Sequence, residues 1–231
     1  MAQYQPRVTA AHTSLLAAIL ISRSNCRNSW NGINRQRFMT NPAPEPLKQN
    51  AIQTAARWVA EKPVYIDTET TGLDKTDEIV EISIVDFNGS VLYSSLVKPS
   101  KSIPAEASRI HGITNEMVAS SQNWLVQWPT IRNILYGRTI AAYNAPFDLR
   151  MMQQSHAAYK FPWRENFKVV DVLALYSDYR GVWNPVRGSM KYFKLEEAGA
   201  SFQIALPNAH RSTADSILTR AVLHSMAGQP F

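Results

Sequence analysis

The spacing of apolar residues predicts both helices and strands along this chain. Apolar residues recur with helical spacing after Pro46, whereas Val80, Ile82 and Ile84 follow the two-residue period of a strand. Strands are expected over residues 64–67, 78–87, 91–97, 138–143 and 168–172. Helices are expected from Pro46, from Pro104, after Pro129, and over 146–159, 173–179, 194–199 and 212–227. Asn88-Gly89 predicts a hairpin turn. This order favours an α/β domain with a mixed sheet of about five strands, the first three antiparallel, flanked by helices.

Composition divides the chain into two parts. Its 231 residues suffice for one well-buried domain and an extension. Residues 1–44 contain five arginines and no acid, which leaves 19 basic and 18 acidic residues in 45–231. We therefore expect an extension over 1–44 and a nearly neutral domain over 45–231. Net charge alone does not indicate a polyanionic partner.

The extension is open to several interpretations. Its longest apolar run, residues 15–21, is too short to span a bilayer, so no membrane association is expected. The run is compatible with a signal peptide, although a poor cleavage site follows it, and residues 1–38 have the composition of an organellar transit peptide. We favour a disordered extension, or a misplaced start codon upstream of Met39. The chain has a single cysteine, Cys26, which fits a reducing compartment, so we expect a cytoplasmic location. The alternative is an organelle, if residues 1–38 are a transit peptide.

Acidic residues stand at three points where a predicted strand ends or a predicted helix begins. Asp67 and Glu69 lie in Asp-Thr-Glu-Thr-Thr-Gly, and Asp148 closes Tyr-Asn-Ala-Pro-Phe-Asp. His210 and Asp215 open the last predicted helix. Acids that meet from distant segments cannot all stay ionised without cations, and oxygen-rich sites suit Mg²⁺ or Mn²⁺. The pattern predicts a two-metal phosphodiester hydrolase.

Each motif taken alone also has a structural explanation. The first acid pair fits a strand that runs into a polar turn. Asp148 fits the first turn of a helix that Asn144 caps, and Asp215 fits position N3 of a helix that Ser212 caps. His210 fits a surface histidine. These explanations do not account for all three motifs in this order, each at an element end that could face one cleft.

The three motifs resemble those of the DEDDh 3′–5′ exonucleases, the DnaQ-like group of the ribonuclease H-like superfamily. Asp67 and Glu69 match the first motif, Asp148 the second, and His210 with Asp215 the third. The spacing His-x-x-x-x-Asp is that of the histidine branch. The tyrosine branch has a tyrosine four residues before the last aspartate, where this chain has an arginine.

The resemblance spans about residues 64–226 and implies a ribonuclease H-like fold and a role for each matched residue. His210 would be the general base, because a free imidazole titrates near neutral pH. The substrate would be a single-stranded or frayed 3′ end of DNA or RNA, and the product a nucleoside 5′-monophosphate. Two divalent cations, Mg²⁺ or Mn²⁺, would be held by Asp67, Glu69, Asp148 and Asp215. Contacts with the terminal nucleotide are expected from Thr70, Thr71, Leu73, His111, Ile113, Asn144 and Phe147.

Three further features have weaker signals. Phe147 is also explained as a core aromatic, and Asp171 is expected to be structural because it has no place in the family's metal set. Residues 180–194 interleave basic and aromatic side chains, a composition that suits single-stranded nucleic acid. A solvated loop explains that segment equally well.

Two functions from different classes compete. A catalytic exonuclease needs the complete set of four acids and a histidine, whereas a non-catalytic nucleic-acid-binding or polymerase-accessory module does not. The set therefore favours the enzyme. A replicase subunit is disfavoured because the resembling proofreading subunit has a C-terminal polymerase-binding tail that this sequence lacks. The residues do not distinguish DNA from RNA, because recognition of the 2′-hydroxyl depends on pocket shape, and they do not reveal the oligomeric state.

Overall fold

The computed structural model describes residues 44–204 and 210–231, which all belong to the unit Thr40–Phe231. The predicted extension lies outside these ranges except for Pro44, and it stays a prediction. Within the described part of the chain, no helix combines the length and the apolar character that crossing a membrane requires.

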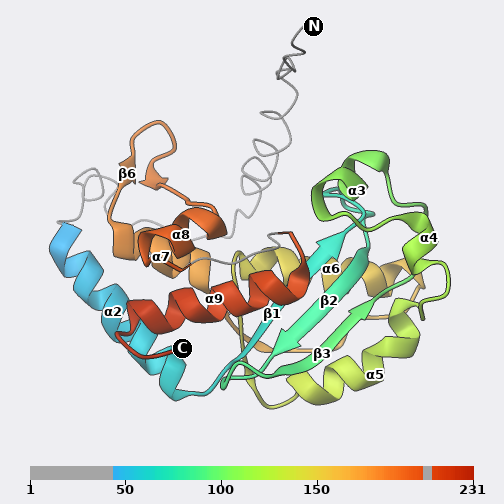
Figure 1. Ribbon diagram of the computed structural model, residues 1–231, viewed down its shortest axis with the longest axis horizontal. Helices are drawn as coiled ribbons and strands as arrows, with labels where there is room; N and C mark the ends of the chain where they lie inside the picture. Colours follow the sequence, from blue (N-terminus) through green and yellow to red (C-terminus); the bar gives the residue numbers. More distant parts are fainter. Residues whose placement is uncertain (1–43, 205–209) are drawn as a thin grey trace, which may run out of the picture. The chain divides into compact units, whose positions relative to one another are not determined.

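A five-stranded mixed sheet forms the centre of the unit (Figure 1). Its order is β3-β2-β1-β4-β5, with β1, β2 and β3 antiparallel and with β4 and β5 parallel to β1. This confirms the predicted fold class. The strands are β1 (Val64–Thr70), β2 (Ile79–Val85), β3 (Val91–Leu96), β4 (Thr139–Ala142) and β5 (Lys168–Asp171).

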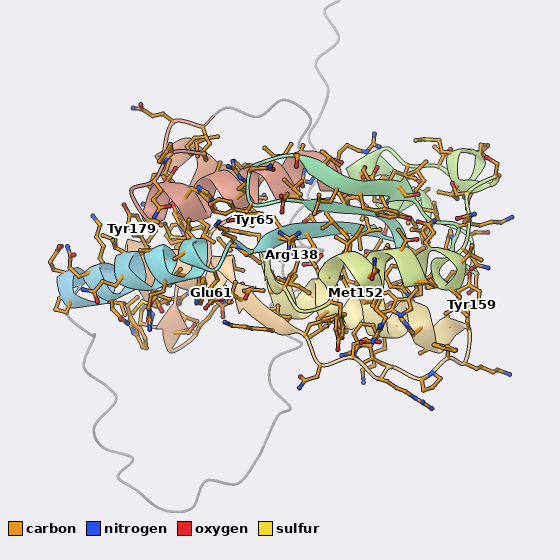
Figure 2. The ribbon with its side chains drawn as sticks, turned by 90° about the horizontal axis from the view of Figure 1, so that it is seen from below. Glu61, Tyr65, Arg138, Met152, Tyr159 and Tyr179 are labelled. Atoms are coloured by element: carbon orange, nitrogen blue, oxygen red, sulfur yellow. The ribbon has the colours of Figure 1, made fainter. Side chains whose placement is uncertain are left out.

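Helices cover both faces of the sheet, and the alternation along β1 shows which residues face each layer. Tyr65 packs with residues of the helices α2 and α9 on one face, whereas Val64 and Ile66 pack with α5 and α6 on the other. Figure 2 shows these layers from below, with Met152 of α6 labelled. The helices are α2 (Pro44–Ala60), α3 (Ala105–His111), α4 (Asn115–Val118), α5 (Trp124–Leu135), α6 (Ala145–Ala158), α7 (Val172–Arg180), α8 (Leu195–Ser201) and α9 (Ser212–Met226).

Several predicted element ends are wrong, each because a local signal was outweighed. Helix α5 begins at Trp124 and not after Pro129, because the side chain of Asn123 caps it and the helix tolerates Pro129 in its interior. The predicted loop after α7 contains a small hairpin, formed by β6 (Trp183–Asn184) and β7 (Ser189–Met190).

The predicted caps of the two helices that carry site residues are also wrong. Asn144 precedes α6 in the left-handed region, at φ 70°, and its side chain makes no capping hydrogen bond. Helix α9 starts at Ser212 with Arg211 in the N-cap position, so Asp215 stands one position later than N3. The hydroxyl of Ser212 instead donates to Glu81 at 3.0 Å.

Candidate active site

The first motif lies on β1, in the half of the strand that runs past the end of β4. Asp67 and Glu69 are two residues apart, so their side chains leave the same face of the sheet, the face that α9 covers. They stand opposite Ser83 and Glu81 of β2. A register shift directly after Glu69 marks a β-bulge, a feature that commonly redirects side chains beside active sites.

The third motif joins the first, and the second lies beside them. Carboxylate oxygens of Asp67, Glu69 and Asp215 lie within 4.8 Å of one another, which makes them a group that could hold a metal ion. Asp148 enters from the first turn of α6 and is buried. Its Oδ1 accepts a hydrogen bond of 2.8 Å from the hydroxyl of Thr68, so one of its oxygens has a protein partner.

All four acids have raised pKa values, and burial is the largest cause for each of them. Burial, and then the charges of Asp148 and Glu69, raise the pKa of Asp67 well above its usual range. Burial, followed by Asp215 and Glu81, raises the pKa of Glu69 to about 8. Burial likewise raises the pKa of Asp148 to about 7 and that of Asp215 to about 6. Without cations, therefore, protons are retained in this cluster near neutral pH.

The donor chemistry of the cluster fits divalent cations. Hard carboxylate oxygens are the ligands that Mg²⁺ and Mn²⁺ prefer, and each cation would offset two of the repelling charges. Asp67, Glu69 and Asp215 form the geometric group, and Asp148 is close enough for its charge to act on Asp67. The residues present are therefore suitable for the predicted metals.

His210 lies at the exposed rim of this cluster. Its backbone has φ 67°, and its N–H donates to Oδ2 of Asp215 at 3.2 Å. Its Nε2 lies 3.7 Å from a carboxylate oxygen of Glu196 on α8, and 52% of its side chain is exposed. An imidazole so placed is accessible to a water molecule and to substrate, as a general base must be.

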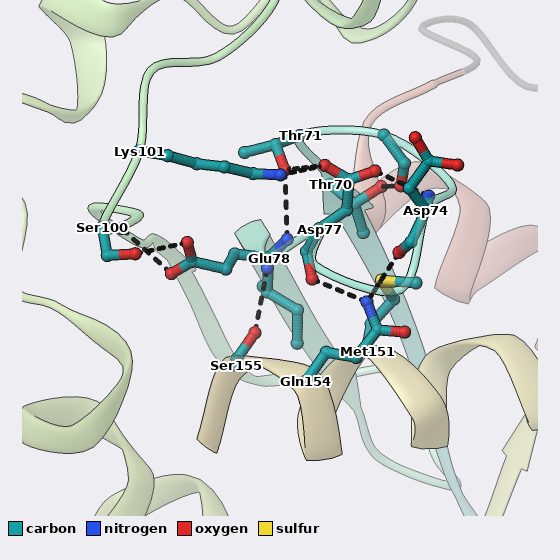
Figure 3. A network of polar contacts seen from close by, with 12 residues as sticks. Thr70, Thr71, Asp74, Asp77, Glu78, Ser100, Lys101, Met151, Gln154 and Ser155 are labelled. Carbon is teal, nitrogen blue, oxygen red and sulfur yellow. Dashed lines mark hydrogen bonds and ion pairs between the residues drawn. The ribbon is translucent and has the colours of Figure 1, made fainter. Parts of the chain in front are cut away.

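A buried carboxylate network shapes the loop that follows the first motif (Figure 3). Asp77 accepts hydrogen bonds from the Thr71 hydroxyl and the Asp74 N–H, each at 2.7 Å, and its ion pair with Lys101 measures 2.5 Å. These donors outweigh burial, so the pKa of Asp77 lies below its usual value. A Cβ at Gly72 would stand 2.6 Å from Oδ2 of Asp77, so the close approach of the loop to this carboxylate requires glycine there.

The predicted nucleotide contacts divide into two groups. Thr70, Thr71, His111 and Ile113 are buried. The N–H of Ile113 donates to Nδ1 of His111 at 3.0 Å, so the proton lies on Nε2, which donates to the Thr70 carbonyl at 3.2 Å. Burial lowers the pKa of His111, consistent with a neutral ring that joins two segments. The half-buried group, which retains some surface for a ligand, comprises Leu73, Asn144 and Phe147.

Two residues with an expected structural role have one. Oδ1 of Asp171 caps α7 by accepting from the N–H groups of Leu173 and Ala174, and it also accepts from the Asn144 N–H at 3.1 Å. Phe147 packs against the core cluster of α5 and α6 and lies under the guanidinium of Arg150, 5.3 Å from the ring centroid. The expected role of Phe147 at the nucleotide stays a prediction.

Basic residues of the segment 180–194 partly cover an aromatic core residue. The guanidinium of Arg180 lies 4.8 Å from the ring centroid of Phe193, and the Lys191 ammonium lies 4.7 Å from it. Arg187 is exposed at the hairpin. Part of this segment therefore stabilises the fold, and its role as a strand path stays a prediction.

One hollow on the described surface lies away from the acids. It measures about 1040 Å³ and is lined by residues that precede β1, β4 and β5, including Lys62, Arg138 and Arg164. The acids that could hold a metal ion lie toward the other ends of these strands. Side-chain chemistry, and not the volume of a hollow, locates the candidate site.

Sequence reasoning missed four residues that support the site: Thr68, Asp77, Glu81 and Arg211. Thr68 lies between the two acids of the first motif, and Arg211 follows the histidine of the third, so proximity to a motif was a usable signal. Asp77 and Glu81 look like ordinary polar positions at the start of a strand. Their partners come from residues as distant as Lys101 and Arg211, which spacing does not reveal.

Comparisons with known proteins agree with this geometry. A family model described as RNase_T, exonuclease, matches residues 64–223. An uncharacterised exonuclease of Escherichia phage 186 is 35% identical over 181 residues, which are 76% of this chain and 93% of that protein. DNA polymerase III subunit epsilon of Treponema pallidum is 29% identical over 154 residues, which are 65% of this chain and 69% of that protein.

Solved structures show the same fold. Exonuclease X, in complex with 5′ overhanging duplex DNA, matches with a TM-score of 0.51 and 26% identity, over 72% of this chain and 93% of that chain. The nuclease domain of 3′hExo, a DEDDh family member bound to rAMP, matches with a TM-score of 0.56 and 14% identity. The match covers 73% of this chain and 93% of that chain. The family model and the phage relative favour the enzyme over a non-catalytic binding module. The chain belongs to the DEDDh 3′–5′ exonucleases of the ribonuclease H-like superfamily.

Proposed function

We propose that the protein removes nucleotides one at a time from single-stranded or frayed 3′ ends, with two divalent cations at Asp67, Glu69, Asp148 and Asp215. The observation that carries this proposal is the meeting of three carboxylates within 4.8 Å, from segments almost 150 residues apart in sequence. Four repelling acids are costly to keep together in a fold, and two Mg²⁺ or Mn²⁺ ions would balance their charge.

The reaction is the hydrolysis of the terminal phosphodiester. The oxygen of a water molecule attacks phosphorus, the bond from phosphorus to the 3′-oxygen of the preceding nucleotide breaks, and that oxygen ends protonated. Bound divalent cations would supply Lewis acidity and charge neutralisation at the phosphate. His210 would accept the proton that the water loses, and the product is a nucleoside 5′-monophosphate.

Two features support nucleotide binding beside the acids. The loop after Glu69 is held by Asp77, and His111 joins that loop to the segment after α3 through its two ring nitrogens. Relatives bind nucleic acid ends: one solved neighbour holds 5′ overhanging duplex DNA, and another is described as recognising the 3′ end of a histone mRNA stem-loop. The choice between DNA and RNA is left to the experiment.

The test uses purified protein with DNA and RNA strands, single- and double-stranded, labelled at either end. We expect release of the 3′-terminal nucleotide in Mg²⁺ or Mn²⁺ and no release with excess EDTA. Asp67→Asn and Asp148→Asn should each lower the rate by about a hundredfold or more, because metal placement contributes several kcal/mol to transition-state stabilisation. Undiminished activity in EDTA, or first release of a 5′ label, would refute the proposal.

A further inference from the structure

Glu81 is a buried acid in the site that belongs to none of the three motifs. It lies on β2 directly opposite Glu69 of β1, and only 3% of it is exposed. Like charges that face each other across an antiparallel pair of strands destabilise the pair. A fifth carboxylate in this position therefore needs a partner that neutralises it.

That partner is Arg211, the residue after His210. Its Nε lies 3.2 Å from both carboxylate oxygens of Glu81, and its Nη2 lies 2.5 Å from Oε1. The N–H and the hydroxyl of Ser212 each donate to Oε2 at 3.0 Å. One buried carboxylate thus accepts from two consecutive residues at the start of α9, and paired contacts of this kind restrict orientation as well as distance.

The contacts determine where α9 begins. Its N-cap residue, Arg211, makes no side-chain capping bond, and Glu81 satisfies the Ser212 N–H from the neighbouring strand instead. A carboxylate at a helix N-terminus is also favoured by the helix dipole. His210 directly precedes this anchor, and Asp215 follows it by one helical turn.

The charges of the pair cancel. Glu81 and Arg211 together add no net charge to the site, so the four metal-binding acids keep the charge that two divalent cations would balance. We propose that Glu81 and Arg211 are a pair of positioning residues, which hold His210 and Asp215 in place without changing the net charge that the cations meet. This inference rests on the proposed roles of His210 and Asp215.

The proposal predicts opposite electrostatic effects for two substitutions that damage the same contact. Glu81→Gln leaves the guanidinium beside Glu69 uncompensated and should weaken Mn²⁺ binding by about tenfold. Arg211→Gln leaves the carboxylate uncompensated and should strengthen Mn²⁺ binding. Both variants should lower kcat at saturating Mn²⁺ by about tenfold or more, because misplacement of reacting groups slows the chemical step.

The experiment measures Mn²⁺ affinity by calorimetry without substrate, and kcat on a 3′-labelled single strand. The double variant Glu81→Gln with Arg211→Gln should recover the parent's Mn²⁺ affinity while kcat stays low. Arg211→Lys keeps the charge and loses the paired contacts, so it should bind Mn²⁺ like the parent and still turn over slowly. The matched control is Asp86→Asn. Asp86 follows the other end of β2 and forms an ion pair with Arg138, so this variant breaks an ion pair away from the site. It should change neither the Mn²⁺ affinity nor kcat.

Three results would overturn the inference. The first is a shift of Mn²⁺ affinity in the same direction in both single variants, with no recovery in the double variant, as expected of a purely structural contact. The second is an Arg211→Lys protein with the parent's kcat. The third is a parent that binds no Mn²⁺, which would refute the proposed function itself and is distinguished from the others by the parent's own titration. Because the Arg211 side chain is 45% exposed and lysine keeps its charge, Arg211→Lys should fold even where the variants that remove a charge do not.

Discussion

The metal-free enzyme should become more stable when one of its acids is removed. We choose Glu69→Gln because Glu69 is surrounded by acids and its pKa rises to about 8. The glutamine keeps the shape of the side chain and cannot ionise. The variant should have no appreciable nuclease activity, yet in EDTA it should unfold at a higher temperature than the parent above neutral pH.

The sign and size follow from proton linkage. An acid whose pKa is raised by folding contributes full stability below its unfolded value and loses that contribution as the pH rises through the folded value. For Glu69 this window runs from 4.5 to about 8. At about 1.4 kcal/mol per pKa unit, the complete loss is at most roughly 5 kcal/mol. A proton bound by one acid lowers the electrostatic repulsion on its neighbours, so part of this loss is avoided in the parent. We therefore expect the free energy of unfolding to rise by about 2–3 kcal/mol in the variant, or Tm by roughly 5–10 °C.

The assay is thermal unfolding followed by circular dichroism at pH 5 and pH 8, with EDTA and with Mn²⁺. The difference between variant and parent reports Glu69 together with its effect on the acids beside it, since titrating groups elsewhere are common to both. Glu81→Gln is the contrasting control, because hydrogen bonds from Arg211 and Ser212 outweigh burial and keep the pKa of Glu81 below its usual value, so its loss should destabilise at both pH values. A Glu69→Gln protein that is no more stable than the parent at pH 8 would refute the reasoning, and Mn²⁺ should stabilise the parent more than the variant.

Four further predictions concern the site and its surroundings. His210→Ala should lower kcat by about a hundredfold and spare Mn²⁺ affinity, and loss of that affinity in calorimetry would contradict its role as base. Asp77→Asn should raise KM for oligonucleotides several-fold with little change in kcat, because it frees the loop proposed to bind the nucleotide, whereas an equal loss in kcat would place its effect elsewhere. Joint replacement of Arg187 and Lys191 by alanine should raise KM for long strands and flatten its salt dependence, and should leave a dinucleotide unaffected. A chain that starts at Met39 should fold, melt within a few degrees of the full chain and retain kcat, and insolubility would contradict this.

Much of the fold and the cluster of carboxylates could be predicted from sequence, because the responsible signals are local. Asp67 and Glu69 follow an apolar run, so a strand and a shared face follow from the two-residue period. Asp215 stands in the first turn of an amphipathic helix. The predicted strand end at Asp67 is wrong, because β1 continues to Thr70 and places Asp67 in mid-strand. The acids of β1 meet Asp215 because β1 runs past the end of β4, and the resemblance supplied the expectation that the three motifs face one another.

The details that could not be predicted depend on contacts between distant residues. Ser212 is a good N-cap by its own chemistry, but its hydroxyl and N–H both bond to Glu81, which lies 131 residues earlier. Asn144 is likewise a good cap, but its N–H is satisfied by Asp171, 27 residues later, and its backbone turns to the left-handed region. Local preference sets what a residue can do, and the tertiary partner decides which of these options is used.

The same distinction divides the acids of the site into two classes. Asp77 and Glu81 have cationic partners from distant segments, Lys101 and Arg211, and the pKa of each lies below its usual value. The charge of Glu81 acts on both Asp67 and Glu69, yet neither of them forms an ion pair with a cation of the protein among the described contacts, and the pKa of each is raised. The acids of the first class are neutralised by the chain itself and therefore hold segments in place. Those of the second class can be neutralised only by protons or by added cations. In the composition, each of these acids counts as one negative charge. Composition therefore could not separate the acids that build the site from those that would bind the metal.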